Sequence, residues 1–122
     1  MIARIDRDVI VAGAGPAGVA VAVALVGLQG LEPRRVLCLE RARFPRAKPC
    51  GGGLTGHAED ALAALGLGVR VPSVACEQGR LVFGRARSVV GLPRPVRVVR
   101  REELDGDLVA QARERGVVIQ EG

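Results

Sequence analysis

The sequence predicts an α/β fold with a parallel β-sheet, because three of its segments follow one another as strand, helix and strand. Asp8 to Ala12 is a short apolar run, and an alanine- and valine-rich stretch from Pro16 to Val26 follows it after a glycine-rich turn. Arg35 to Glu40 is a second apolar run with strand character. Two strands joined through a helix lie parallel and form a right-handed crossover. We therefore expect a Rossmann-like βαβ domain, which we assign to residues 1–122.

The turn between the first strand and the helix has the spacing Gly13-x-Gly15-x-x-Gly18. In a dinucleotide-binding fold the first glycine permits the tight turn, the second lets the backbone approach a pyrophosphate, and the third lets the helix pack closely on the strand. The helix N-terminus favours the anion through its unpaired N–H groups and its dipole. Pro16 suits the first helical position, where a missing N–H costs nothing. We assign nucleotide binding to Gly13, Gly15, Pro16, Ala17 and Gly18.

Two alternatives to this interpretation are a membrane-spanning helix and a turn that binds no ligand. Val9 to Leu28 carries no charge and is long enough to cross a bilayer core of ~30 Å as a helix. Its glycines and Pro16 fall near its start, where they would break a spanning helix but suit a strand-to-helix turn. The second reading is a glycine-rich turn that binds no ligand, so the motif needs support from its context.

That support comes from the end of the second strand. Glu40 ends the apolar run, 22 positions after Gly18. In the dinucleotide fold an acid about 20 residues beyond the glycines accepts hydrogen bonds from a ribose hydroxyl. We assign this role to Glu40 over the alternative of a solvated carboxylate at a strand end. Arg41 follows directly and is a candidate contact for the adenine or a phosphate, or else a surface arginine.

Composition limits the function classes. The 122 residues are about one domain, which is short for a cofactor enzyme with its own substrate domain. The hydrophobic fraction of 48% suits an α/β protein, while the aromatic fraction of 2% leaves packing to valine, leucine and alanine. The net charge of +5 comes from 17 arginines and one lysine against 13 acids, scattered and not interleaved with aromatics. This pattern disfavours nucleic-acid binding.

The cysteine and histidine content does not suggest a metal site. Cys38, Cys50 and Cys76 form no C-x-x-C pair, and His57 is the one histidine. Three unpaired cysteines suggest a reducing compartment. The first eight residues are charged and lack the apolar core of a signal peptide. We expect a cytoplasmic protein.

The segment from Arg41 to Gly53 is expected to be a shaped loop and not a flexible linker. Its two prolines fix the backbone, and its glycine triplet permits close approach to something flat or anionic. After it, Thr55 is expected to cap a helix from Gly56 to Leu65. Two glycines, at 66 and 68, end that helix.

Three short β-like runs follow, separated by glycine and proline: Arg80 to Gly84, Ser88 to Val90 and Val96 to Val99. We expect them to form a small antiparallel excursion from the main fold. Apolar residues at helical spacing then predict a helix from Arg101 to Arg115. Val117 to Gln120 starts one more buried strand.

Four motifs together resemble the geranylgeranyl reductase family. This family is a branch of the FAD-dependent oxidoreductases that share the fold of aromatic hydroxylases such as p-hydroxybenzoate hydroxylase. The K-x-C-G-G-G block is the specific part and distinguishes this branch from halogenases and most hydroxylases. The motifs are G-A-G-P-A-G at Gly13 to Gly18, L-E-R at Leu39 to Arg41, K-P-C-G-G-G-L at Lys48 to Leu54, and R-E-E-L-D-G-D-L at Arg101 to Leu108.

The resemblance implies FAD as the cofactor, with the glycine turn at its pyrophosphate and Glu40 on its adenosine ribose. It places the loop from Lys48 to Gly53 near the flavin and lets Arg101 reach FAD from the start of its helix. Arg100 is the alternative, but Arg101 meets the family's spacing to the following leucine and aspartate. The added cofactor-binding candidates are Lys48, Cys50, Gly51, Gly52 and Arg101.

Members of the family reduce carbon–carbon double bonds of isoprenoid chains by hydride transfer from reduced FAD. Cys50 is the one candidate catalytic residue, and a small buried thiol that simply fits beside three glycines is the alternative. The resemblance implies FAD and an isoprenoid or other small molecule as partners of the full-length enzyme, and it allows peripheral membrane association.

The chain departs from the family in length. Members continue into a second FAD-contacting segment and a substrate domain, so we expect an N-terminal, FAD-binding portion that is inactive alone. Two other hypotheses remain, an FAD-dependent monooxygenase or hydroxylase and a non-catalytic, truncated nucleotide-binding fragment.

Overall fold

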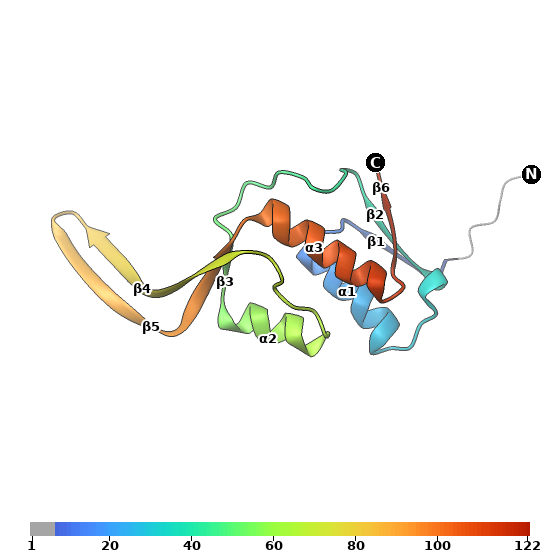
Figure 1. The fold of residues 1–122 in the computed structure, drawn as a ribbon, viewed down its shortest axis with the longest axis horizontal. Helices are drawn as coiled ribbons and strands as arrows, with labels where there is room; N and C mark the ends of the chain where they lie inside the picture. Colours follow the sequence, from blue (N-terminus) through green and yellow to red (C-terminus); the bar gives the residue numbers. More distant parts are fainter. Residues whose placement is uncertain (1–6) are drawn as a thin grey trace, which may run out of the picture.

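In a computed structural model, residues 7–122 form a three-stranded parallel sheet with helices on it and a separate antiparallel sheet (Figure 1). The charged residues before position 7, which contributed to the argument against a signal peptide, lie outside the described residues. No helix within residues 7–122 is long and apolar enough to cross a membrane. The segment proposed as an alternative membrane span is instead the strand, turn and helix that its glycines predicted.

The parallel sheet confirms the predicted α/β fold. It contains β1 (Val9–Ala12), β2 (Val36–Glu40) and β6 (Val118–Glu121), in the order β1-β2-β6. Both pairings are parallel, as the helix crossovers require. The three strands end level with one another, because Leu39 pairs with Ala12 on one side and with Gln120 on the other.

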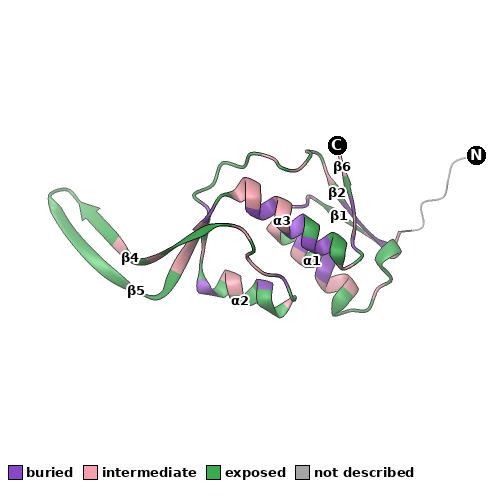
Figure 2. Ribbon diagram, in the orientation of Figure 1, coloured by how far each residue is buried: buried purple, intermediate pink, exposed green. Residues whose placement is uncertain are grey.

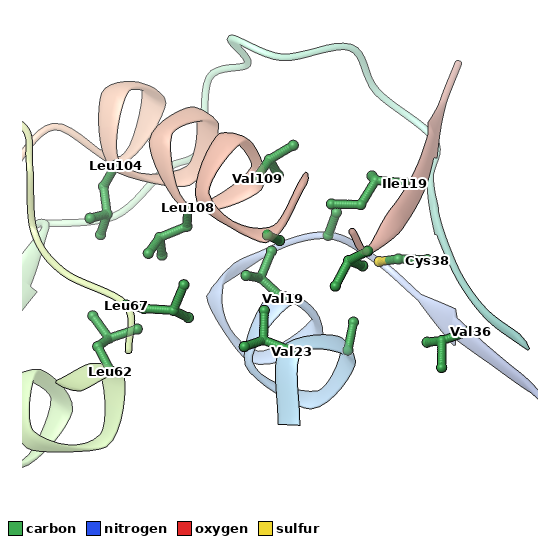
Figure 3. Packing of buried hydrophobic residues seen from close by; sticks show 14 of the residues in the cluster. Val19, Val23, Val36, Cys38, Leu62, Leu67, Leu104, Leu108, Val109 and Ile119 are labelled. Carbon is green, nitrogen blue, oxygen red and sulfur yellow. The ribbon is translucent and has the colours of Figure 1, made fainter. Parts of the chain in front are cut away.

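Two helices cover one face of this sheet. α1 (Pro16–Gly27) packs on β1 and β2, and α3 (Arg101–Glu114) packs on α1 and β6. The core between them is aliphatic, which follows from the low aromatic content (Figure 3). Its largest fully buried side chains include Leu104 and Leu108 of α3 and Val19 of α1. On the opposite face of the sheet the side chain of Ile10 is 61% exposed.

The helix ends follow the sequence signals. α1 begins at Pro16 as predicted and ends one residue beyond Val26. A short 3₁₀ turn, η1 (Pro33–Arg35), leads into β2. α2 (Gly56–Ala64) has Thr55 as its N-cap, and the Thr55 hydroxyl accepts a hydrogen bond from the Ala58 N–H at 3.3 Å.

The excursion predicted as small is instead a long hairpin, and this corrects the predicted strand lengths. β4 (Ser73–Phe83) pairs with β5 (Ala86–Val99), and β3 (Gly53–Leu54) pairs with the other edge of β5. The hairpin extends away from the helices, and most of it is exposed (Figures 1 and 2). The prolines 93 and 95 had suggested breaks between short strands. They fall between the paired positions Gly91 and Val96, where the register shifts and no ladder hydrogen bond is required of them.

Candidate functional site

A cleft of about 1000 Å³ opens at the carboxyl ends of the three parallel strands. The ends of β1, β2 and β6 line it, together with the first residues of α1, the loop residues 46–49 and Arg101 at the start of α3. In parallel α/β sheets this edge is where ligands bind, because the helix N-termini and the connecting loops meet there. We call it the carboxyl-edge cleft.

The glycine turn forms one wall of the carboxyl-edge cleft. Gly13 adopts φ 101°, a conformation that glycine reaches at little cost. Gly15 is the N-cap of α1, and no side chain caps this helix and no acid lies in its first turn. No acid of the helix itself therefore neutralises the positive end of its dipole, which favours an anion at this wall.

Gly15 and Gly18 serve different purposes. A Cβ built at Gly15 would meet only the Arg46 guanidinium, with Nη2 at 3.6 Å, which is ordinary contact. A Cβ at Gly18 would overlap the Gly13 carbonyl oxygen. Gly18 therefore allows the helix to pack on the turn and does not line the cleft. Gly15 lines the cleft, and nothing in the fold itself requires a glycine there.

Glu40 lies at the end of β2 with its side chain only 8% exposed. Its Oε2 accepts a hydrogen bond from the Ala14 N–H at 2.9 Å, and its Oε1 accepts one from the Ala42 N–H at 3.1 Å. The Ala14 N–H is the main cause that lowers the pKa of Glu40; Ala42 and nearby arginines add to it. Glu40 thus joins the glycine turn to the second strand. Its role at a ribose remains a prediction, for which each carboxylate oxygen keeps a further lone pair.

The loop from Lys48 to Gly53 divides at Cys50. Lys48 and Pro49 line the cleft, whereas Cys50, Gly51 and Gly52 do not. Gly52 has φ 72°, and a Cβ there would overlap the Val99 carbonyl oxygen, so this glycine lets the loop pack against β5. The assignment of Cys50, Gly51 and Gly52 to the cofactor remains a prediction.

Cys50 is exposed, which differs from the buried thiol considered as its alternative. Its Sγ accepts a hydrogen bond from the Gly52 N–H at 3.4 Å. That bond and a second one from Arg101 lower the pKa of the Cys50 thiol. By contrast, burial raises the pKa of Cys38 in the core.

Arg101 lines the cleft, and a buried carboxylate fixes its guanidinium. Arg101 Nε and Nη2 donate to Asp105 Oδ1 and Oδ2 at 2.7 and 3.0 Å. Asp105 has a side chain that is 0% exposed, and its hydrogen bonds raise the pKa of Arg101. This pairing also holds Arg101 in place at a helix start, where the dipole disfavours a cation.

Arg46 is a cleft residue that sequence reasoning did not single out. Its Nη1 lies 3.1 Å from Asp105 Oδ2, and its Nε lies 3.9 Å from Glu40 Oε1. The guanidinium carbon also stacks 4.9 Å from the centre of the Phe44 ring. Although Arg46 Nη1 is buried, it makes no aligned hydrogen bond within residues 7–122. Nothing in the sequence distinguishes Arg46 from the other cations of the same loop.

Charge in the cleft favours an anionic ligand. Four cationic side chains line it, against two carboxylates. The cations are Arg41, Arg46, Lys48 and Arg101, and the carboxylates are Glu40 and Glu121. The end of β6 contributes Gln120, Glu121 and Gly122, which the sequence analysis also did not assign. No group of three or more histidine, cysteine or acidic side chains in the described part of the chain could hold a metal ion.

Comparison with known sequences gives partial matches. No family model matches the chain. It is 52% identical over 63 residues to menaquinone reductase of Mycobacterium tuberculosis, a match that covers 52% of this chain and 14% of that protein. It is 29% identical to an uncharacterised protein of Methanosarcina barkeri over 125 residues, covering all of this chain and 30% of that one.

Solved structures match the fold over nearly the whole chain. The flavin-dependent brominase Bmp2 is 28% identical with a TM-score of 0.77, over 93% of this chain and 29% of the brominase. The tetrameric form of 2-methyl-3-hydroxypyridine-5-carboxylic acid oxygenase is 28% identical with a TM-score of 0.76, over 94% and 31%. A geranylgeranyl bacteriochlorophyll reductase-like protein of Thermoplasma acidophilum is 21% identical with a TM-score of 0.72, over 93% and 29%.

These matches classify the chain by its fold and do not identify its reaction. Its structural relatives include a halogenase, an oxygenase and a reductase-like protein, so the fold alone does not distinguish among these activities. The chain spans between 14% and 30% of the length of the curated relatives described above. Residues 7–122 have the Rossmann-type α/β fold found in flavin-dependent oxidoreductases and oxygenases.

Proposed function

We propose that this chain is the FAD-binding portion of a flavin-dependent oxidoreductase. The observation that carries the proposal is Gly15, which lines the carboxyl-edge cleft although the fold would tolerate a side chain there. A glycine with free space beside it at a helix N-terminus is what close approach of a pyrophosphate requires. The Arg46 guanidinium, whose Nη2 lies 3.6 Å from the place of a Gly15 Cβ, also supports an anionic ligand at the same turn.

The residues of the cleft suit the parts of a dinucleotide. The N–H groups at the start of α1, including that of Ala17, which lines the cleft, would bind the pyrophosphate. Glu40 would accept hydrogen bonds from the ribose hydroxyls through its remaining lone pairs. Arg101, Arg41 and Lys48 would donate to phosphate or ribitol oxygens, and a guanidinium suits this because its planar fork offers several donors.

FAD, when bound, supplies the redox chemistry, and the protein supplies position and electrostatics. The chain's own contribution is to bind the anionic half of the cofactor and to orient it at the edge of the sheet. Cys50 would lie toward the flavin, and hydrogen bonds from the Gly52 N–H and from Arg101 lower the pKa of its thiol. Its catalytic assignment rests on the family resemblance.

For the reaction we propose reduction of a carbon–carbon double bond in an isoprenoid chain, as in geranylgeranyl reductases. The K-P-C-G-G-G-L block supports it, and so does the 52% identity to a protein named as a menaquinone reductase. Binding of a long apolar substrate requires further structure, so we expect the 122 residues alone to be inactive. We keep the cytoplasm as the proposed location, with peripheral membrane association of a full-length enzyme.

A second candidate is an FAD-dependent monooxygenase or hydroxylase. It is favoured by the 28% identity to the brominase and to the pyridine carboxylic acid oxygenase, which exceeds the identity to the reductase-like structure. Both candidates use the same cofactor in the same cleft. They differ in the molecule with which the reduced flavin reacts.

The cofactor can be tested directly. The purified chain is titrated with FAD and with NADP by calorimetry, and any nucleotide released from the purified protein is identified by chromatography. We expect FAD to bind and to give the visible flavin spectrum, with NADP binding much more weakly. Tight NADP binding without any flavin would overturn the assignment.

A further inference from the structure

The feature behind this inference is a buried carboxylate shared by two arginines of the cleft. Asp105 lies on α3 with its side chain fully buried. Arg101 comes from the same helix, four residues earlier, whereas Arg46 comes from the loop that follows β2. Asp105 Oδ2 accepts a hydrogen bond from Arg101 Nη2 at 3.0 Å and forms an ion pair with Arg46 Nη1 at 3.1 Å.

We propose that Asp105 is a positioning residue that holds Arg46 and Arg101 as a pair of anion-binding guanidinium groups in the carboxyl-edge cleft. The inference rests on the proposed function for the identity of the anion. It does not require Asp105 itself to touch the cofactor, because Asp105 does not line the cleft, whereas both arginines do.

The two arginines contact Asp105 in different ways. Arg101 uses one edge of its guanidinium, Nε and Nη2, for Asp105. Arg46 turns Nη1 toward Asp105 without an aligned hydrogen bond, and its Nη2 lies beside the position where a Gly15 side chain would project. Each guanidinium thus meets Asp105 with only some of its nitrogens, and Arg46 Nη2 is left beside the glycine turn for a ligand oxygen.

Burial makes this arrangement effective. The side chains of Arg46 and Arg101 are 15% and 18% exposed, so little water competes for their donors. Long arginine side chains lose considerable freedom when they are ordered, and a site that orders them before binding avoids that loss at the binding step. Asp105 therefore favours anion binding although its own negative charge opposes an anion.

This opposition gives a test with two opposite outcomes. If Asp105 acted only through its charge, Asp105→Asn would tighten the binding of FAD and of inorganic pyrophosphate. If Asp105 positions the arginines, the same substitution weakens FAD binding by at least about tenfold, since each well-oriented charge-assisted hydrogen bond is worth that much or more. Affinities are measured by calorimetry, and unfolding of each variant is measured in parallel.

Asp107→Asn is the matched control. Asp107 lies two residues further along α3 and pairs with Arg70 at 2.8 Å, and neither residue lines the cleft. The control therefore removes a helix carboxylate and its arginine partner's ion pair without touching the cleft. We expect it to lower stability and to leave FAD affinity unchanged.

A double-mutant cycle identifies the route of the effect. In a background carrying Arg46→Ala and Arg101→Ala, Asp105→Asn should no longer weaken FAD binding, because the arginines that it positions are gone. A tenfold loss in that background would show that Asp105 does not act through the arginines and would overturn the proposal.

A measurement without cofactor keeps the inference separate from the proposed function. The mobility of the Arg46 and Arg101 guanidinium groups can be followed by ¹⁵N relaxation at Nε in the ligand-free protein. We expect Asp105→Asn to mobilise both, and Asp107→Asn to mobilise neither. If the wild type fails to bind FAD but this result holds, the proposed function is wrong and the positioning role stands; equal rigidity in Asp105→Asn would overturn the positioning role.

Discussion

Two glycine-rich segments lie near the same cleft, and Gly15 of the first and Gly52 of the second serve opposite purposes. In the turn from Gly13 to Gly18, Gly15 lines the cleft and has only the end of a flexible side chain near its missing Cβ. In the loop from Gly51 to Gly53, Gly52 faces the backbone of β5 and does not line the cleft. A glycine needed for a ligand has free space beside it, whereas a glycine needed for packing has backbone there.

The largest effect is expected where glycine serves packing. Gly52→Ala should lower the free energy of unfolding by at least about 3 kcal/mol, because it combines a positive φ with overlap on the Val99 carbonyl. Gly51→Ala is the matched control, since nothing lies within 4 Å of its Cβ, and it should change stability by less than about 0.5 kcal/mol. Chemical denaturation followed by circular dichroism measures both. Equal stability of the two variants would remove the distinction between packing and ligand glycines.

The next effect concerns the glycine that serves the ligand. Gly15→Val should weaken FAD binding by at least about 100-fold, or roughly 2.7 kcal/mol, because the side chain occupies the space that the pyrophosphate needs. Its stability should stay within about 1 kcal/mol of the wild type, because a Cβ there meets only Arg46 Nη2, at ordinary contact distance. Gly27→Val, at the far end of α1, provides a control for the added side chain. Retained FAD affinity in Gly15→Val would make the turn purely structural.

The third prediction concerns Glu40, which both contacts the glycine turn and lines the cleft. Glu40→Ala should weaken FAD binding by about 1–3 kcal/mol through loss of charge-assisted hydrogen bonds to ribose. An unchanged dissociation constant, by calorimetry, would restrict Glu40 to holding the turn.

Glu40 also predicts a pH dependence of stability. Because its pKa is lowered in the folded state, its ionised form stabilises the fold above the usual pKa of 4.5, and that contribution is lost as pH falls through the lower, folded value. Denaturation of wild type and Glu40→Gln across this range should show a smaller loss at acid pH in the variant. Parallel profiles would contradict the hydrogen bond to Ala14 as a source of stability.

The smallest effect is expected at Cys50, which directly precedes the glycines of the second segment. Its lowered pKa predicts faster alkylation by iodoacetamide at neutral pH than an ordinary thiol shows. Arg101→Ala should slow the reaction several-fold, because one of the two hydrogen bonds that lower the pKa is lost. Cys38, which is buried and has a raised pKa, should stay unmodified in the native protein. Peptide mass spectrometry over time measures each rate, and equal rates in the wild type and Arg101→Ala would remove Arg101 as a cause.

The sequence alone determined the order and type of the elements around the cleft. The strand, glycine turn and helix from Val9 to Gly27, the Thr55 cap and the second strand all lie within a residue or two of their predicted bounds. These features depend on local properties, namely apolar periodicity, capping side chains and the backbone freedom of glycine. The acid at Glu40 was also predictable, because its distance from the glycines follows from the length of one β-α-β unit.

Only the tertiary structure decided which side chains meet. The hairpin of β4 and β5 exceeded its predicted length because strand pairing is non-local, so that the prolines could be accommodated where the register shifts. Similarly, Arg46 and Asp105 are 59 positions apart in sequence, and their contact depends on how the loop after β2 packs against α3. The three glycines at 51–53 look alike in the sequence. What separates them is what each one faces: nothing within 4 Å at Gly51, the Val99 backbone at Gly52 and the Val96 side chain at Gly53. These neighbours are fixed only when β5 lies against the loop.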